Sequence, residues 1–297
     1  ASSVFEKMSE NEKLRLLSTL RREEIDPWLT TREREQTYWA NQDMRWSYNE
    51  RRYKKLLQYH PGGLLLYLYG NSGQVEHLFD LFRKVFEAIA EQGVNAEERG
   101  YLSGIVRRVD EQYYTDEWAK CCLLLYKKEL LQKPPLCLQR LFFRHPDKMK
   151  MFLEENPSRS FDVENDYYLP EEAYQDKRAF DCWAECLYEE FPEILGYIMG
   201  KSCNGKDGAF PHEFIREFLE KQQNEKLTKA VFYGKFNSRG ARIVQDGRTL
   251  YEQAKCYRAQ ARELRLKFPQ SAKILLQLAK WMESEAQHDQ LEAEIVP

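Results

Sequence analysis

The amino-acid sequence predicts an all-α protein of stacked helical hairpins that ends in a close-packed antiparallel helix pair, and two observations support this. Alanine recurs every seven residues in two stretches near the C-terminus, a spacing that lets two helix backbones approach closely. Glycine (14 residues) and proline (11) are sparse among 297 residues, whereas charged residues reach 31%, which favours amphipathic helices over strands joined by turns. The hairpins are expected to form an irregular α-α superhelix or two helical subdomains.

The C-terminal pair is the most specific structural prediction. It covers residues 249–294, and the short connection Lys267–Pro269 makes its two helices antiparallel neighbours. Two rows of side chains are expected to face each other and be buried: Leu250, Ala254, Tyr257, Ala261 and Leu264 on the first helix, and Leu275, Leu278, Ala279, Met282 and Ala286 on the second.

The N-terminal half is predicted to open with two capped helices. Ser9 and Thr30 each begin a capping box, in which the hydroxyl and a glutamate three residues later satisfy free backbone amides. These helices should end near residues 26 and 59. Residues 64–69 are predicted as either a short strand or a buried helical turn, and the neighbouring helices favour the helical turn. Further helices are predicted from Val75 to a stop at Gly93, from a start at Leu102 through Val109, after Thr115, and over 136–144 and 146–155.

A domain boundary is predicted near residue 160, because 156–169 is rich in Pro, Ser, Asp and Asn. This gives an N-terminal helical subdomain over 1–160 and a C-terminal one over 161–297. The second opens with a helix from Pro170 to Phe191, which places proline at its first position and two glutamates against the helix dipole. Residues 231–244, interrupted by glycines, leave room for a small β-hairpin or an ordered loop.

Composition excludes several classes of protein. A net charge of −3, from 45 basic and 48 acidic residues, argues against a globally basic nucleic-acid binder. Apolar runs are too short to cross a bilayer, which needs about twenty residues. Seven cysteines without framework spacing are typical of free thiols in a reducing cytoplasm. We therefore expect a soluble cytoplasmic protein with no disulfide, either complete after methionine removal or a fragment of a longer one.

Motifs that resemble known sites have simpler explanations. Gly200–Asp207 approaches a phosphate-binding P-loop, but Asp207 stands where a magnesium-binding hydroxyl is needed, so a flexible loop between helices is favoured. Cys182 and Cys186 lie one helical turn apart without further metal-spaced ligands, and the five histidines are scattered. The sequence therefore indicates no metal, no cofactor and no catalytic residue.

One basic segment is a candidate binding site for anions or nucleic acid. Its cations are Lys235, Arg239, Arg242 and Arg248, and they alternate with glycines that allow a ligand to approach the backbone. Nearby aromatic residues could stack on a base. A second segment, 32–55, also alternates arginines with aromatic residues, although an amphipathic helix with an aromatic core face explains it more simply.

Function follows from the predicted architecture only by analogy. Helical arrays offer rigid grooves for peptides and protein partners, so the first hypothesis is a non-catalytic, cytoplasmic protein-interaction or scaffold module. The second is a nucleic-acid-associated module that uses the basic segment, which steep salt dependence of binding would identify. The third is an enzyme whose polar groups converge only in three dimensions, which a pocket with perturbed titrating groups would favour.

Overall fold

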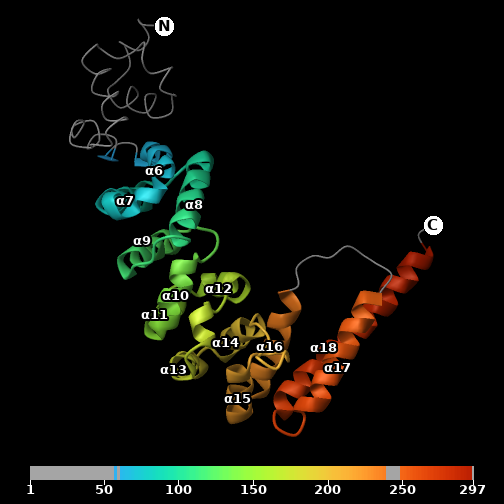
Figure 1. The fold of residues 1–297 in the computed structure, drawn as a ribbon. Coiled ribbons are helices and arrows are strands. Elements are labelled where there is room, and N and C mark those ends of the chain that lie inside the picture. Colours follow the sequence, from blue (N-terminus) through green and yellow to red (C-terminus); the bar gives the residue numbers. More distant parts are fainter. Residues whose placement is uncertain (1–56, 59–60, 239–247, 296–297) are drawn as a thin grey trace, which may run out of the picture. The chain divides into compact units, whose positions relative to one another are not determined.

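A computed structural model describes residues 57–58, 61–238 and 248–295 of the chain (Figure 1). Every regular element in these ranges is a helix, which confirms the predicted all-α class. The helices predicted before residue 57, the aromatic-basic stretch 32–55, and both Arg239 and Arg242 lie outside the described residues.

Two compact units make up the chain, and they meet between Cys137 and Leu138. This division comes earlier than the boundary expected near residue 160. The reason is that residues 156–169 belong to the interior of the second unit: Val163 and Tyr167 are fully buried, and the Tyr167 hydroxyl donates to the Gln139 carbonyl at 2.9 Å. The described helices of the first unit are η3 (Pro61–Leu64), α6 (Leu65–Gly70), η4 (Ser72–Gln74), α7 (Val75–Gln92), α8 (Ala96–Asp110) and α9 (Asp116–Lys127).

Local capping sets the ends of the first unit's helices, at the predicted places for the end of α7 and the start of α9, whereas α8 begins at Ala96 and not at the predicted Leu102. Gly93 follows α7 with a φ of 81°, a left-handed conformation that glycine adopts without strain. Asn95 and Glu98 form a capping box at the start of α8, and the Thr115 hydroxyl accepts from the Trp118 amide at the start of α9. The helices pack around an aromatic core that includes Phe82, Phe86 and Trp118.

Helix α10 (Leu136–Arg144) begins at the boundary, and the second unit continues from it. Its remaining elements are α11 (Pro146–Glu155), η5 (Pro157–Arg159), α12 (Ser160–Asp166), η6 (Glu171–Tyr174), α13 (Lys177–Tyr188), α14 (Pro192–Gly200), α15 (Glu213–Gln222), α16 (Glu225–Asn237), α17 (Arg248–Leu264) and α18 (Pro269–Ile295).

Two sequence predictions in this unit need correction. The expected loop over 156–169 contains η5 and α12, because Val163 and Tyr167 give it a buried face despite its polar composition. The single helix expected from Pro170 to Phe191 is divided into η6 and α13. Asp176 causes the break, since its carboxylate accepts from the amides of Arg178 and Ala179 and so starts a new helix.

Helices α14 and α16 form a close pair held by small residues. An added Cβ at Gly234 would lie 2.2 Å from the Tyr197 carbonyl oxygen, and one at Gly200 would lie 2.3 Å from the Val231 carbonyl oxygen. Residues 231–237 are therefore helical, and the β-hairpin or loop predicted from residue 231 is wrong for this part. Gly234 serves close packing rather than a turn.

The segment from Gly200 to Asp207 begins at the last residue of α14 and continues into the loop between α14 and α15, as predicted. Both carboxylate oxygens of Asp207 accept from the Arg216 guanidinium at 2.7 Å, and Arg216 is 1% exposed. The ring of Phe268 lies 5.4 Å from that guanidinium. Asp207 therefore neutralises a buried arginine, which explains the residue that departs from the P-loop pattern.

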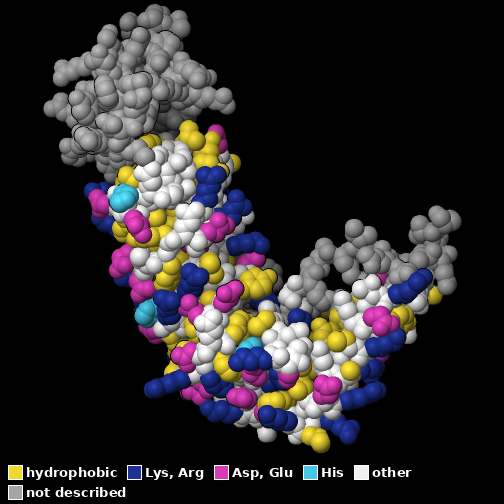
Figure 2. Space-filling model, in the orientation of Figure 1, with side chains coloured by type: hydrophobic (Ala, Val, Ile, Leu, Met, Phe, Trp, Pro, Cys, Tyr) yellow, Lys and Arg dark blue, Asp and Glu magenta, His cyan; other side chains and the backbone are white. Residues whose placement is uncertain are grey.

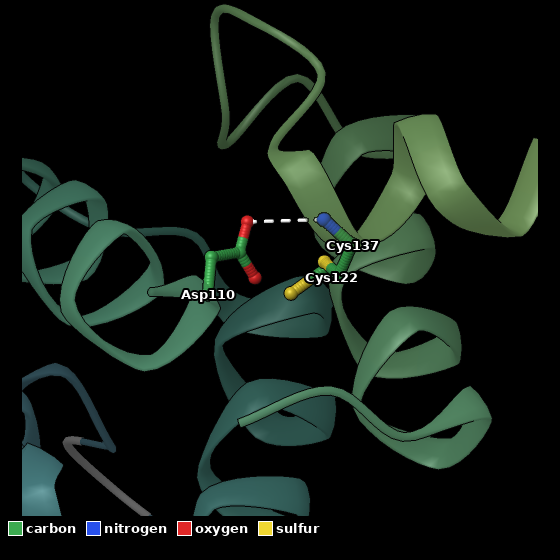
Figure 3. Close-up of side chains that lie close together, drawn as sticks. All are labelled: Asp110, Cys122 and Cys137. Carbon is green, nitrogen blue, oxygen red and sulfur yellow. Dashed lines mark hydrogen bonds between the residues drawn. The ribbon is translucent and has the colours of Figure 1, made fainter. Parts of the chain in front are cut away.

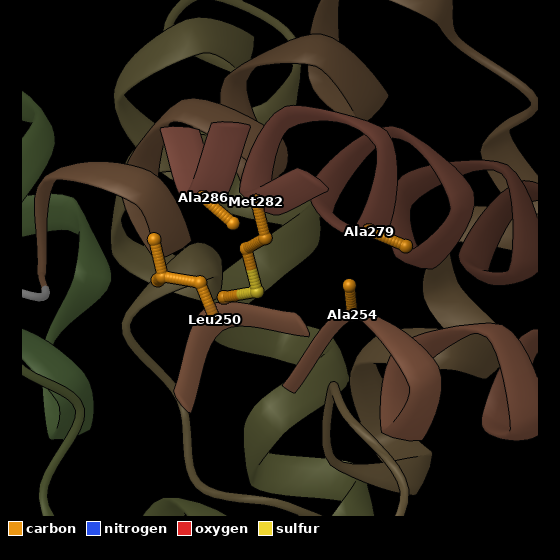
Figure 4. Packing of buried hydrophobic residues seen from close by; sticks show 5 residues of the cluster. All are labelled: Leu250, Ala254, Ala279, Met282 and Ala286. Carbon is orange, nitrogen blue, oxygen red and sulfur yellow. The ribbon is translucent and has the colours of Figure 1, made fainter. Parts of the chain in front are cut away.

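The C-terminal hairpin of α17 and α18 agrees with its prediction. Leu250 and Ala254 on α17 point toward Ala279, Met282 and Ala286 on α18 (Figure 4). All ten residues predicted to face inward are buried except Tyr257, which is half-buried against this cluster. A bidentate ion pair between Arg258 and Glu283, at 2.6–2.7 Å, also joins the two helices.

Candidate functional site: a groove along helix α8

The surface of α8 carries two adjoining hollows that share Ser103 and Arg107. One has a volume of about 580 Å³ and the other about 500 Å³. We call them together the α8 groove. The first hollow is lined by Tyr69, Glu97, Gly100, Tyr101, Ser103, Gly104 and Arg107. The second is lined by Ser103, Val106, Arg107, Asp110, Glu111, Leu131, Gln132, Lys133, Pro135 and Leu136.

Helical periodicity places the groove on one face of α8. Gly100, Ser103, Gly104 and Arg107 recur at intervals of three and four residues, so they follow one another along the helix surface. Another face carries Leu102, Ile105 and Val109, which are buried in the core of the first unit. The groove therefore lies on a helix whose other face is packed in the core of the first unit.

The first hollow has a fixed aromatic wall. The Tyr69 ring packs on Gly104, where an added Cβ would lie 2.6 Å from its Cε2 atom. The Arg108 guanidinium lies 3.9 Å from the centre of the same ring and donates to the Tyr69 hydroxyl at 2.8 Å. Open space remains beside Gly100, which has no atom within 4 Å of an added Cβ. The wall is thus held in place while the floor stays accessible.

Asp110 anchors the second hollow. Its carboxylate accepts from the Trp118 indole nitrogen at 2.9 Å and from the Cys137 backbone amide at 3.2 Å. Figure 3 shows the second of these bonds. Asp110 therefore joins the end of α8 to α9 and to the first turn of α10, whose amides attract a carboxylate. Burial raises the pKa of this carboxyl group, while its hydrogen bonds act in the opposite direction.

Cys122 and Cys137 lie against Asp110, and the three potential ligand atoms are within 4.8 Å of one another (Figure 3). Burial raises the pKa of both thiols, which keeps them protonated at neutral pH. A structural zinc site uses four ligands with deprotonated sulfurs, and the described residues supply three donors here. The cluster is therefore best explained as packing around a capping carboxylate. The spacing of the cysteines in the sequence gives no indication that Cys122 and Cys137 lie together against Asp110.

Arg107 is an unpaired charge of the groove, and Glu111, four residues further along the chain, is another. Both side chains are exposed, and neither forms a hydrogen bond or ion pair with the part of the chain that the structure describes. One side of it is the aromatic hollow, and the other is lined by the apolar side chains of Val106, Leu131, Pro135 and Leu136. A free guanidinium between two partly apolar hollows suits an acidic group flanked by apolar groups. No sequence motif surrounds Arg107, so its place in a site becomes evident only in the fold.

The structure describes two of the four residues predicted to bind anions. Lys235 is half-buried in the last turn of α16, and its amine lies 4.4 Å from the centre of the Phe210 ring. Arg248 is exposed at the start of α17. Arg239 and Arg242 fall outside the described residues, so the anion site remains a prediction. Lysine in a last helical turn also complements the negative end of the helix dipole without any ligand.

The described surface has no extended region of one charge in the view of Figure 2, where basic and acidic side chains are interspersed. None of the described helices combines the length and the apolar character needed to span a membrane. The sequence matches no known protein-family model, and it matches neither a curated protein nor a solved structure at a significant level. Any functional conclusion must therefore come from the chemistry of the sites themselves.

Proposed function

We propose that this chain is a non-catalytic protein-interaction module that binds a short, extended peptide segment of a partner protein in the α8 groove. The observation that carries the proposal is that two hollows adjoin on α8 and share Ser103 and Arg107 in their lining. A helix of 15 residues is about 22 Å long, which matches six or seven residues of extended peptide.

The chemistry of the groove suggests the sequence of such a peptide. Arg107 would pair with a central aspartate or glutamate, and the exposed guanidinium requires no existing ion pair to be broken. Apolar side chains two or three positions away would occupy the hollow beside Leu131 and Pro135. All seven cysteines are free thiols in the structure, so we also propose that the module works in a reducing compartment such as the cytoplasm.

Selection from a library of displayed seven-residue peptides tests this proposal, because the library samples every candidate sequence for the bound segment without an identified partner protein. The expected result is enrichment of peptides with one central acidic residue and neighbouring apolar residues. Fluorescence anisotropy with a labelled selected peptide then measures affinity. Arg107→Glu should weaken binding at least tenfold, since it replaces an attractive charge-assisted hydrogen bond with repulsion.

Three matched variants sharpen this test. Lys120→Glu makes the same charge change on the exposed surface of α9 and should change affinity less than twofold. A peptide with lysine in place of its acidic residue should bind the Arg107→Glu protein more tightly than it binds the wild-type protein. Ser103→Phe fills the groove from an exposed position and should abolish binding. Selected peptides that bind Ser103→Phe as tightly as wild type would contradict the proposal.

A separate experiment tests the alternative that the chain is a nucleic-acid-associated module. Binding of single-stranded DNA or RNA that falls steeply with salt concentration, and that is lost when Arg239 and Arg242 are replaced by alanine, would favour it over peptide binding.

A further inference from the structure

A third pocket lies in the second unit, where the C-terminal ends of α12, α14 and α16 converge. Its volume is about 230 Å³. Because α12 ends at Asp166, α14 at Gly200 and α16 at Asn237, the last turns of three helices face the same space. The pocket is lined by Glu164, Asp166, Tyr168, Tyr197, Lys201, Gly234, Asn237 and Ser238.

Lys201 is the lysine that lines this pocket, and its amine is held in place on two sides. It follows α14 directly, and its Nζ donates to the Glu164 carbonyl oxygen at 2.5 Å. The same atom lies 4.8 Å from the centre of the Tyr168 ring. Burial lowers the pKa of the Lys201 amine to about 7, although the nearby carboxylates of Asp166 and Glu164 act in the opposite direction. A large share of this amine is therefore neutral, and so nucleophilic, at neutral pH.

Electrostatics select against an anionic ligand in this pocket. Each helix C-terminus carries a partial negative charge of about half an elementary charge, and three of them meet here. Glu164 and Asp166 add two carboxyl groups. Burial raises the pKa of Glu164, Glu193 adds to this effect, and Lys201 acts in the opposite direction. A phosphate or carboxylate compound would be repelled, whereas an uncharged compound would not.

The lining of the pocket is mainly polar, and two tyrosine rings add apolar surface for a small organic group. Tyr168 is 44% exposed, so its ring is accessible from solvent as well as from the amine. The Tyr197 ring is stacked on that of Tyr233, with centroids 6.3 Å apart and an interplanar angle of 14°. Gly234 also lines the pocket, but the Tyr197 backbone occupies the space where its side chain would lie. Helix capping alone explains the bond to Glu164, but it does not require an open space beside the amine with two tyrosines in its lining.

We propose that the Lys201 pocket binds a small uncharged aldehyde or ketone covalently, as an imine of the Lys201 amine. The nitrogen lone pair attacks the carbonyl carbon, and one proton moves from nitrogen to oxygen to give a carbinolamine. Loss of the hydroxyl with a second proton from nitrogen then forms the C=N bond and releases one water molecule. The carboxyl groups of Glu164 and Asp166 lie at the pocket to relay these protons. The reaction requires no oxidant or reductant.

Reductive trapping on the intact chain tests this proposal. Butanal with cyanoborohydride at pH 7 converts any imine to a stable alkylated lysine, which peptide mass spectrometry locates. At this pH roughly a thousandfold more of an amine with a pKa near 7 is neutral than of an ordinary lysine amine. A less basic amine is also a weaker nucleophile. If this dependence is as steep for amines as for thiols, the alkylation rate of the amine with a pKa near 7 remains about thirtyfold higher than that of an ordinary lysine. Lys201 should therefore be alkylated at least tenfold faster than the exposed Lys226 of α16.

Two comparisons separate a binding pocket from a merely reactive amine. Asn237→Phe fills the pocket from an exposed position while retaining Lys201, and it should reduce alkylation of Lys201 at least tenfold without affecting Lys226. Glyoxylate is an anionic aldehyde, so the ratio of Lys201 alkylation to Lys226 alkylation should be much lower with glyoxylate than with butanal. Equal alkylation of the two lysines by butanal, or unchanged alkylation of Lys201 in Asn237→Phe, would overturn the proposal. Neither result bears on the α8 groove, which lies in the other unit.

Discussion

The close contact between α14 and α16 gives a quantitative prediction for Gly234→Ala. The added Cβ would lie 2.2 Å from the Tyr197 carbonyl oxygen and 2.9 Å from the Tyr197 Cα, and both are backbone atoms that cannot rotate away. An ordinary contact is about 3.4 Å, so the two helices would have to separate by about 1 Å and lose packing along their length.

The expected loss of stability follows from two opposing effects. Overpacking a well-packed contact costs about 3 kcal/mol, at the upper end of its usual range because backbone atoms are involved. Replacing glycine by alanine inside a helix gains about 1 kcal/mol. The free energy of unfolding should therefore fall by about 2 kcal/mol, a roughly thirtyfold change in the folding equilibrium.

Urea unfolding followed by circular dichroism measures this change, and Gly100→Ala provides the matched control. Gly100 is also inside a helix, but no atom lies within 4 Å of its added Cβ. Its replacement should stabilise the first unit by about 1 kcal/mol through helix propensity alone. A Gly234→Ala variant as stable as wild type, alongside a stabilised Gly100→Ala, would refute the close approach of α14 and α16.

Three further predictions use the same reasoning. Ala261→Glu places a charge at a position that is 2% exposed, so the melting temperature should fall by an amount equivalent to about 3 kcal/mol, whereas Ala259→Glu on the exposed face of α17 should change it little. Asp110→Ala leaves the Trp118 indole and the Cys137 amide without their acceptor, so urea unfolding should show a loss of about 3 kcal/mol; an unchanged midpoint would contradict the capping role. Because the folded pKa of Lys201 is about 7 and its ordinary value is 10.5, Lys201 binds more protons in the unfolded chain between these values, and its contribution to the free energy of unfolding should rise with pH across this window. The buried thiols contribute with the opposite sign in both proteins. The difference in the free energy of unfolding between wild type and Lys201→Met should therefore increase with pH, and equal slopes in the two proteins would count against a depressed pKa.

Helix ends are predicted most reliably where residues close together in the sequence mark them. The bounds predicted for α10 and α11 match the structure, because proline and the apolar spacing mark their ends locally. Polar composition misled the prediction for 156–169, since the buried residues of that segment, which include Val163, Tyr167 and Leu169, are few among its polar ones. A local average over residue types cannot detect so small a face.

The sequence by itself determined the all-α class, the ends of α7, α10 and α11, and the C-terminal hairpin, because periodicity and capping act within a few turns of chain. Tertiary structure decided which distant groups meet. Gly234 is a turn signal in the sequence and a contact with Tyr197 in the fold. Arg107 gains its place in a groove, and Lys201 its lowered pKa, from surroundings assembled by segments far apart in sequence. Burial and electrostatic potential depend on all neighbours in space, and only folding sets them.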